Sequence, residues 1–351
     1  MTPPLSPGII GGPAAWKGPA LQTRPDWIKH FSNQELDELK LAVRVHQDSG
    51  RDMGAINATT FKLPTLAPTL ALIKQELLQG RGFVVMRGLD VASLTIEEAA
   101  IAYLGLGAHL GSFRSQNAKG HLLGHVRDLG LNIKNPNVRY YQTNRALDYH
   151  TDSCDVVGLL CLRAAKTGGY SRLVSSVSLH DAFFERRPAL WRALFNAFPT
   201  DRRGEIPPGM QPWFDMPIFH WFEGQLTTIY VGQYIRSAQA LFPQARRLTD
   251  LELEAIAVLD QWADDDEFAL GMEFLPGDIQ FVHNHQILHS RTDFENWPEP
   301  ERQRHLFRLW LAPPQARRLP PVFASRYGSL EAGARGGIIT QSTTLTFSLV
   351  P

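Results

Sequence analysis

Apolar residues recur at helical spacing in three segments within the first 110 residues. Ser32 and Glu35 have the spacing of a capping box and precede the first of these segments, so a helix is predicted to begin at Ser32. A second amphipathic pattern covers residues 66–78. A second capping box, Thr95 with Glu98, predicts a third helix that runs toward Gly105.

Beyond about residue 138 the pattern changes to short extended runs, several of them separated by Gly and Pro turns. Counting one earlier apolar run, strands are predicted at 83–86, 138–143, 156–163, 172–177, 226–235, 268–274, 279–283 and 306–311. Helical patterns interrupt them at 179–187, 190–198 and 249–263. The sequence therefore predicts a mostly β fold with surrounding helices (α+β), built around a sandwich or barrel of the jelly-roll kind.

No internal repeat or low-complexity block divides the chain. Residues 1–27 are rich in Pro and Gly and lack periodicity, so we expect an irregular N-terminal arm. Residues 28–316 are predicted to form a single jelly-roll domain with N-terminal and inserted helices. Residues 317–351 are expected to form an irregular C-terminal tail.

Composition and charge favour a globular protein that acts on small molecules. The 351 residues are 44% hydrophobic, which is enough for a substantial core. Lys and Arg total 35, as do Asp and Glu, and the basic residues are dispersed, so we expect no nucleic-acid partner. The chain has two cysteines, no pattern of a secretory signal and no apolar stretch long enough to cross a bilayer. We therefore expect a cytoplasmic protein without membrane contact.

His150 and Asp152 lie two residues apart, and both carry side chains that bind metals. On an extended segment, residues i and i+2 point to the same side, so these two can face one point. A second strand can bring His289 to that point. Two imidazoles and one carboxylate on one side of an ion leave the opposite positions open, as a ferrous centre needs to bind a cosubstrate and dioxygen. The pattern indicates an iron site, although His-x-Asp also occurs by chance in many chains.

Nearby residues are alternative ligands. His283 and His285 compete with His289, since they lie in the same segment and share a strand face with each other. Asp155 competes with Asp152, but on a regular strand it would face away from His150. The residues by themselves leave these alternatives open.

Arg304 and Arg308 lie in a segment with alternating apolar residues, which predicts that both point inward. On a strand, residues four apart share a face but lie about 13 Å apart, so the two would serve different anions. Arginine binds a carboxylate through two parallel charge-assisted hydrogen bonds, and burial of its charge is costly until an anion completes the pair. Solvated surface arginines would also fit this segment.

An ordered series of motifs connects these residues to a known family. The pieces are 150–152, 167–171, 276–278, 284–291 and 304–311. Over roughly residues 80–312 the chain resembles the TauD/TfdA-like (taurine dioxygenase-like) branch of the Fe(II)- and 2-oxoglutarate-dependent oxygenases. The resemblance implies a double-stranded β-helix core of the cupin type, and the series as a whole carries it, since no single piece would suffice.

The resemblance also implies roles for individual residues. His150, Asp152 and His289 would bind iron. Arg304 would hold the distal carboxylate of 2-oxoglutarate, assisted by the hydroxyl of Ser171. Arg308 matches the position that holds the anionic group of the substrate in the family members that use sulfonates.

The expected activity is therefore oxidation of an unactivated C–H bond in a small, anionic substrate, with Fe(II), 2-oxoglutarate and dioxygen. Hydroxylation, desaturation and cyclisation remain alternatives, each with release of succinate and carbon dioxide, and secondary metabolism is the expected setting. Two other hypotheses use the same fold: a cupin-like metal-dependent hydrolase or isomerase, and a catalytically silent jelly-roll binding protein. A homo-oligomer is compatible with the sequence.

Overall fold

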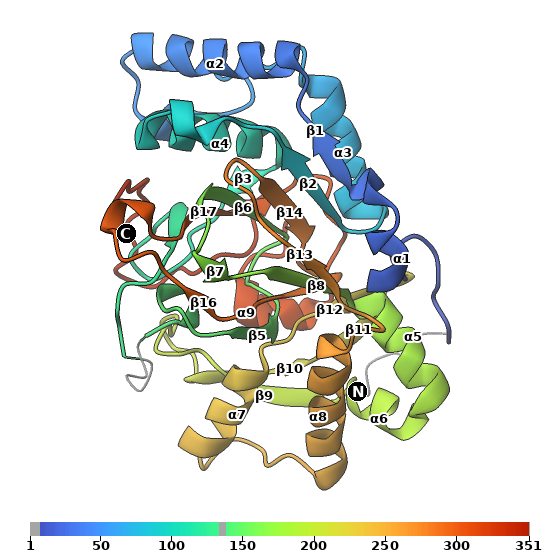
Figure 1. The fold of residues 1–351 in the computed structure, drawn as a ribbon. Coiled ribbons are helices and arrows are strands. Elements are labelled where there is room, and N and C mark those ends of the chain that lie inside the picture. The colour runs from blue at the N-terminus through green and yellow to red at the C-terminus, as the bar shows by residue number, and fades with distance from the viewer. Residues whose placement is uncertain (1–7, 133–137, 351) are drawn as a thin grey trace.

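Two β-sheets packed face to face form the centre of the computed structural model, which describes residues 8–132 and 138–350 (Figure 1). The larger sheet has the order β1-β2-β14-β6-β17-β3, and β4 also pairs with β17. Its strands are β1 (Ile28–His30), β2 (Phe83–Arg87), β3 (Ser112–Phe113), β4 (Leu123–Val126), β6 (Val156–Arg163), β14 (Ile279–His283) and β17 (His305–Ala312). Every residue of β14 and β17 is buried, because other elements cover both faces of the sheet centre.

The smaller sheet is antiparallel and has the order β13-β8-β15-β5. Its strands are β13 (Leu270–Met272), β8 (Ser171–Ser175), β15 (Ile287–Arg291) and β5 (Leu147–His150). Val157, Val282 and Trp310 of the larger sheet share one apolar cluster with Leu173 and Ile287 of the smaller sheet. The two sheets therefore enclose a common core, and the predicted jelly-roll class is confirmed.

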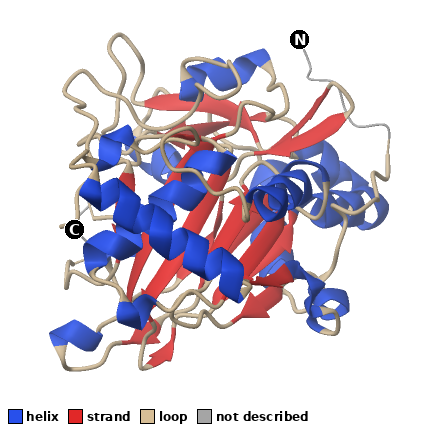
Figure 2. Ribbon diagram, turned by 90° about the horizontal axis from the view of Figure 1, so that it is seen from above, coloured by secondary structure: helices blue, strands red, loops and turns tan. Residues whose placement is uncertain are grey.

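Three helices cover the outer face of the larger sheet: α2 (Asn33–Asp48), α3 (Ala67–Gln79) and α4 (Ile96–Leu110). Seen from above, helices cross in front of the strands (Figure 2). Both predicted capping boxes, at Ser32 and Thr95, are present. Helix α4 continues past Gly105, where a Cβ atom would lie 2.2 Å from the ring of Phe61. The glycine thus permits close packing and does not end the helix.

A second layer of helices packs on the smaller sheet: α5 (Ser176–Arg186), α6 (Pro188–Ala193) and α8 (Asp250–Asp264), with α7 (Gly232–Leu241) beside β9. Short two-stranded sheets pair β9 (Ala197–Asp201) with β10 (Trp213–Pro217), β11 (Phe219–Phe222) with β12 (Gln225–Thr228), and β7 (Thr167–Gly168) with β16 (Phe294–Glu295). Within the described ranges, no helix combines the length and apolar character needed to span a bilayer.

Several predicted elements are wrong. In place of the strand at 138–143, the chain forms a 3₁₀ turn at Tyr140–Gln142. The strand at 226–235 is in fact β12 followed by α7, and the helix at 190–198 ends at Ala193 before β9 begins. Short apolar runs do not distinguish strand from helix by periodicity, which explains these errors.

The N-terminal segment differs from the expected irregular arm. Residues 1–7 lie outside the described part of the chain, but α1 (Gly18–Gln22) and a 3₁₀ turn at Pro25–Trp27 are regular. Trp16, Leu21 and Trp27 are buried in the cluster between the two sheets. The large apolar side chains of this segment therefore anchor it to the core.

The C-terminal tail contains a 3₁₀ turn, η6 (Pro321–Phe323), and the short helix α9 (Ala324–Tyr327). Farther along, the side chain of Arg335 is buried and donates to both carboxylate oxygens of Asp155, at 2.8–3.0 Å. The backbone N–H of Gly337 donates to the carbonyl oxygen of Ser153 at 2.7 Å. The tail is therefore bonded to the loop between β5 and β6.

Candidate active site

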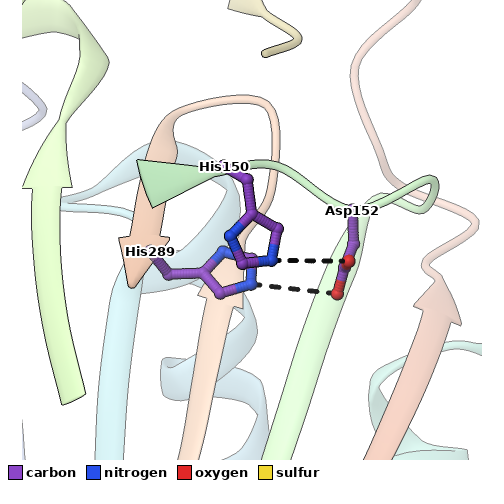
Figure 3. A group of neighbouring side chains, drawn as sticks. All are labelled: His150, Asp152 and His289. Atoms are coloured by element: carbon purple, nitrogen blue, oxygen red, sulfur yellow. Dashed lines mark ion pairs between the residues drawn. The ribbon is translucent and has the colours of Figure 1, made fainter. Parts of the chain in front are cut away.

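Three metal-binding side chains meet where β5 and β15 lie side by side. His150, the last residue of β5, is directly opposite His289 of β15, and their ring centroids are 4.3 Å apart. Asp152 follows, with Oδ1 3.9 Å from Nε2 of His150 and Oδ2 3.8 Å from Nε2 of His289. The candidate ligand atoms all lie within 4.8 Å of one another, so one divalent ion can contact all three side chains (Figure 3).

Asp152 reaches the site by a different path from the one expected. Strand β5 ends at His150, so Asp152 lies in the loop before β6 and not on the same strand. The backbone N–H of Asp152 donates to Oδ1 of Asn284 at 2.7 Å. The Nδ2 atom of Asn284 donates to the carbonyl oxygens of Asp152 and Cys154, at 2.6 and 2.9 Å. A buried amide in the turn between β14 and β15 thus fixes the loop.

The hydrogen bonding and electrostatics of the three side chains suit a metal ion. Nδ1 of His150 donates to the carbonyl oxygen of Asp148 at 2.8 Å, because a carbonyl only accepts, and Nε2 is the ring atom that faces Asp152. Burial, with a smaller effect of His150, lowers the pKa of His289 to about 3, so its imidazole is neutral at physiological pH. Burial opposes ionisation of Asp152, but Arg308 and the two histidines hold the pKa of its carboxyl below the usual value. This donor set is the one that non-haem ferrous iron takes.

The rival ligands lie elsewhere. The metal-binding cluster found among the described residues includes neither Asp155 nor His283 or His285. Asp155 is fully buried and pairs with Nε2 of His285 at 2.8 Å and with Arg335. His283 ends β14, and its ring lies 5.8 Å from that of His285. His289 is therefore the histidine that faces His150.

A small cavity beside His289 is lined by three buried arginines, Arg291, Arg304 and Arg308. Arg304 precedes β17 and Arg291 ends β15, and their guanidinium carbons lie 5.1 and 4.7 Å from the ring centre of Phe294. Burial lowers the pKa of Arg304 to about 10 and that of Arg291 to about 9, so both remain cationic at neutral pH. Ser171 of β8 lines the same cavity.

The charge of Arg304 lacks a counterion among the residues that the structure describes. In the described part of the chain, no carboxylate forms an ion pair with it, and its Nη1 atom is buried without a hydrogen-bond partner. Breaking a buried ion pair by removing one partner costs roughly 3–5 kcal/mol, so a lone buried guanidinium signals an anionic ligand.

Arg291 was not among the residues predicted to form the site. The signal was available, because Arg291 lies two residues after His289, and residues i and i+2 of a strand share a face. Its Nη2 donates to the carbonyl oxygens of Thr143, at 3.1 Å, and Arg145, while Nη1 is buried without a partner in the described structure. Arg291 therefore adds positive charge to the small cavity.

A larger cavity of about 1240 Å³, including its open mouth, borders His150 and Asp152. Its aromatic lining consists of Tyr140, Tyr141, Tyr149, Phe214, Tyr234 and Trp310. Arg308 is buried and lines both cavities. Its Nε donates to Oε1 of Gln116 at 2.7 Å, and its Nη1 lies 3.5 Å from Oδ2 of Asp152. The prediction that both arginines point inward is confirmed.

Several residues of the larger cavity were missed by sequence reasoning. Arg139 pairs with Glu205 at 3.0 Å and donates to the hydroxyl of Tyr234 at 3.0 Å. Arg326 and Ile338 come from the C-terminal tail. Arg139 lies in a run that was predicted as a strand, and the two tail residues lie beyond every recognised motif, so nothing in the sequence assigned these residues to the site.

Comparison with known proteins identifies the family. The model described as "Taurine catabolism dioxygenase TauD, TfdA family" matches residues 46–310. FR-33289 synthase of Streptomyces rubellomurinus is 26% identical over 332 residues, which cover 93% of this chain and 97% of that protein. Taurine hydroxylase-like protein SAT17 of Stachybotrys chartarum is 30% identical over 323 residues, which cover 90% of this chain and 83% of that protein.

Solved structures share the fold. An asparagine oxygenase in complex with Fe(II), 2S,3S-3-hydroxyasparagine and succinate has a TM-score of 0.63 at 19% identity and covers 81% of this chain. The non-heme iron oxygenase OrfP in complex with Fe and alpha-ketoglutaric acid has a TM-score of 0.61 at 13% identity, also over 81% of this chain. In both cases 93% of the solved chain is covered. The family match spans most of the sequence, including the triad and both Arg304 and Arg308. The chain therefore belongs to the TauD/TfdA family of Fe(II)- and 2-oxoglutarate-dependent dioxygenases.

Proposed function

We propose that this dioxygenase oxidises an unactivated C–H bond of a small anionic substrate. Iron would be held by His150, Asp152 and His289, and 2-oxoglutarate by Arg304 and Ser171. One atom of dioxygen enters succinate, formed as 2-oxoglutarate loses carbon dioxide, and the other enters a hydroxylated product or leaves as water after desaturation or cyclisation.

The observation that carries the proposal is the buried charge of Arg304, which lacks a counterion among the described residues and lines the cavity beside His289. A dicarboxylate fits this arrangement, because one carboxylate can pair with the guanidinium while the other end reaches the triad. The hydroxyl of Ser171 can donate to the same carboxylate. A zinc hydrolase would have no use for this cation, so the geometry favours the dioxygenase over the hydrolase and the silent binding protein.

The similar proteins support this reading. The asparagine oxygenase complex contains Fe(II) and succinate, and one OrfP complex contains Fe and alpha-ketoglutaric acid. Their hydroxylated amino-acid ligands are small molecules. The name of FR-33289 synthase fits a role in secondary metabolism.

The protein's own residues would bind the iron and the substrates, orient the metal ligands and exclude bulk water from the site. When bound, ferrous iron supplies the oxidising chemistry, coupling decarboxylation of 2-oxoglutarate to oxidation of the substrate. Nε1 of Trp310 donates to Oδ2 of Asp152 at 2.9 Å, which orients the carboxylate. The hydrogen bond from His150 to the carbonyl oxygen of Asp148 orients that imidazole. The apolar walls of the larger cavity keep the reacting C–H bond away from bulk water.

The larger cavity is the proposed site of the prime substrate. It is lined by His150 and Asp152 but not by Arg304, which lines the small cavity, so substrate and 2-oxoglutarate can be bound together. Arg308 lines both cavities, and it would contribute positive charge to the anionic group of the substrate.

The test is oxygen-dependent conversion of 2-oxoglutarate to succinate by the iron-loaded protein, with a panel of small carboxylic, sulfonic and phosphonic acids. Arg304→Gln should raise the KM for 2-oxoglutarate by at least about tenfold, since it removes a charge-assisted pair. Arg302→Gln is the matched control, because this neighbouring side chain is half exposed. Equal KM values in the two variants would refute the role of Arg304, and a folded, iron-loaded protein that never forms succinate would refute the activity.

A further inference from the structure

We propose that Arg326, in the C-terminal tail, binds the oxyanion group of the prime substrate. Arg326 lies outside residues 46–310, which the family model matches, and beyond every motif of the sequence. The inference rests on the proposed function for the location of the oxidised carbon. It adds a residue that selects the substrate and names the substrate class as carboxylates, sulfonates or phosphonates.

The position of Arg326 places its charge beside the loop that carries Asp152. Its Nε donates to Oγ of Ser153 at 2.9 Å, and Ser153 directly follows Asp152. Arg326 and Ser153 both line the larger cavity. The guanidinium carbon lies 5.6 Å from the ring centre of Phe214, another lining residue. An anion bound by Arg326 therefore lies close to the iron-binding loop.

The other cations of the cavity are already engaged. Arg139 forms an ion pair with Glu205 at 3.0 Å and donates a hydrogen bond to the hydroxyl of Tyr234. Arg203 stacks on the ring of the same tyrosine. Arg308 bonds Gln116 and lies 3.5 Å from the carboxylate of Asp152.

Arg326, in contrast, forms no ion pair with any carboxylate of residues 8–132 and 138–350, and its one side-chain hydrogen bond found there is to the hydroxyl of Ser153. It is therefore the lining guanidinium best placed to take an external anion, through the two parallel hydrogen bonds that arginine makes with oxyanions.

A second guanidinium strengthens the electrostatic argument. Arg202 is buried, its guanidinium carbon lies 5.0 Å from the ring centre of Phe214, and its Nη1 has no hydrogen-bond partner among the described residues. Burial first, and then the charge of Arg326, lower the pKa of Arg202 to about 10. Two like charges against one ring repel each other, and an anion bound at Arg326 relieves this repulsion.

The tail holds Arg326 in place before a substrate arrives. Nη2 of Arg202 donates to the carbonyl oxygen of Ser325 at 2.6 Å, directly before Arg326. The tail is also fixed to the loop between β5 and β6. Gly337 donates a hydrogen bond to Ser153 of this loop, and Arg335 forms an ion pair with Asp155 of the same loop. A binding group fixed in this way loses little conformational entropy on binding. Because Arg326 contacts the residue next to Asp152, the oxidised carbon should lie within a few bonds of the acid group.

The experiment compares wild type with Arg326→Gln, Arg326→Lys and Arg318→Gln. Arg318 is the control, as an exposed tail arginine paired with Glu223 outside the cavity. In the succinate assay with the best acid of the panel, Arg326→Gln should raise the KM for that acid by at least about tenfold. Arg326→Lys should recover part of the loss, and the KM for 2-oxoglutarate should stay within about twofold, since Arg326 lies outside that cavity.

A binding measurement that needs no turnover keeps the test independent of the proposed activity. With protein saturated with Fe(II) and 2-oxoglutarate under argon, inorganic sulfate should raise the Tm of wild type and Arg318→Gln, but not that of Arg326→Gln. Equal stabilisation of all three proteins by sulfate would overturn the assignment of Arg326. So would a succinate assay in which neutral amides are substrates as good as the corresponding acids. Absence of succinate with intact Arg326-dependent sulfate binding would instead refute only the oxygenase activity.

Discussion

Replacing Arg335 by Met should destabilise the protein strongly, although this residue lies far from the sequence motifs. Its Nε and Nη2 atoms donate to both oxygens of Asp155, and both side chains are fully buried. Removing one partner of a buried ion pair costs roughly 3–5 kcal/mol, because the other charge remains in a poorly solvated place. His285 still pairs with Asp155 at 2.8 Å, so we expect the lower end, a loss of about 3 kcal/mol.

The assay is equilibrium unfolding of the metal-free protein in urea, followed by tryptophan fluorescence. Arg318→Met is the matched control, because that side chain is exposed and its pair with Glu223 should contribute at most about 1 kcal/mol. Adding Asp155→Asn to Arg335→Met should recover part of the loss, since the stranded charge is removed. A loss below about 1 kcal/mol for Arg335→Met, or no recovery in the double variant, would refute the reasoning.

Three further predictions concern the two cavities and the buried ion pair of Asp155. Ser171→Ala should raise the KM for 2-oxoglutarate by about two- to tenfold, the effect of one lost hydrogen bond, and an unchanged KM in the succinate assay would contradict its role. Arg308→Ala should weaken binding of the anionic substrate and raise the ratio of succinate to oxidised product; a wild-type ratio would show that Arg308 is structural. Burial opposes ionisation of Asp155, but His285 and Arg335 hold its pKa below the usual value, so its stabilising effect is present above about pH 4 and is lost as the pH falls. The unfolding free energy, measured in urea at each pH, should therefore fall less below that pH in Asp155→Asn than in wild type. The same pH dependence in both proteins would contradict this.

Long amphipathic segments and strong caps were the part of the fold that the sequence predicted well. Helices α2 and α4 begin where their capping boxes indicate. Strands β6 and β14 match their predicted bounds, because continuous apolar runs bounded by turns were correctly taken as buried strands. The errors at 138–143 and 226–235 occur in short runs, where tertiary packing and not periodicity decides the structure.

The candidate site was predictable where its residues occur in motifs of fixed spacing. His150, Asp152 and His289 converge as expected, although Asp152 does so from a loop whose path depends on Asn284. No local pattern showed that Arg326 would reach Ser153, or that Arg335 would be buried beside Asp155. Such contacts join segments more than 170 residues apart, and only the folded chain reveals them.

We propose that one ferrous ion, held by His150, Asp152 and His289, receives 2-oxoglutarate in the cavity of Arg304. The most direct measurement is an anaerobic titration of the protein with Fe(II) and 2-oxoglutarate, followed by the weak visible charge-transfer band of the chelate. We expect one iron and one 2-oxoglutarate per chain, with the band lost in Asp152→Ala and shifted to much higher 2-oxoglutarate concentrations in Arg304→Gln. A folded, iron-loaded protein without this band, or with the same band in all variants, would contradict this proposal.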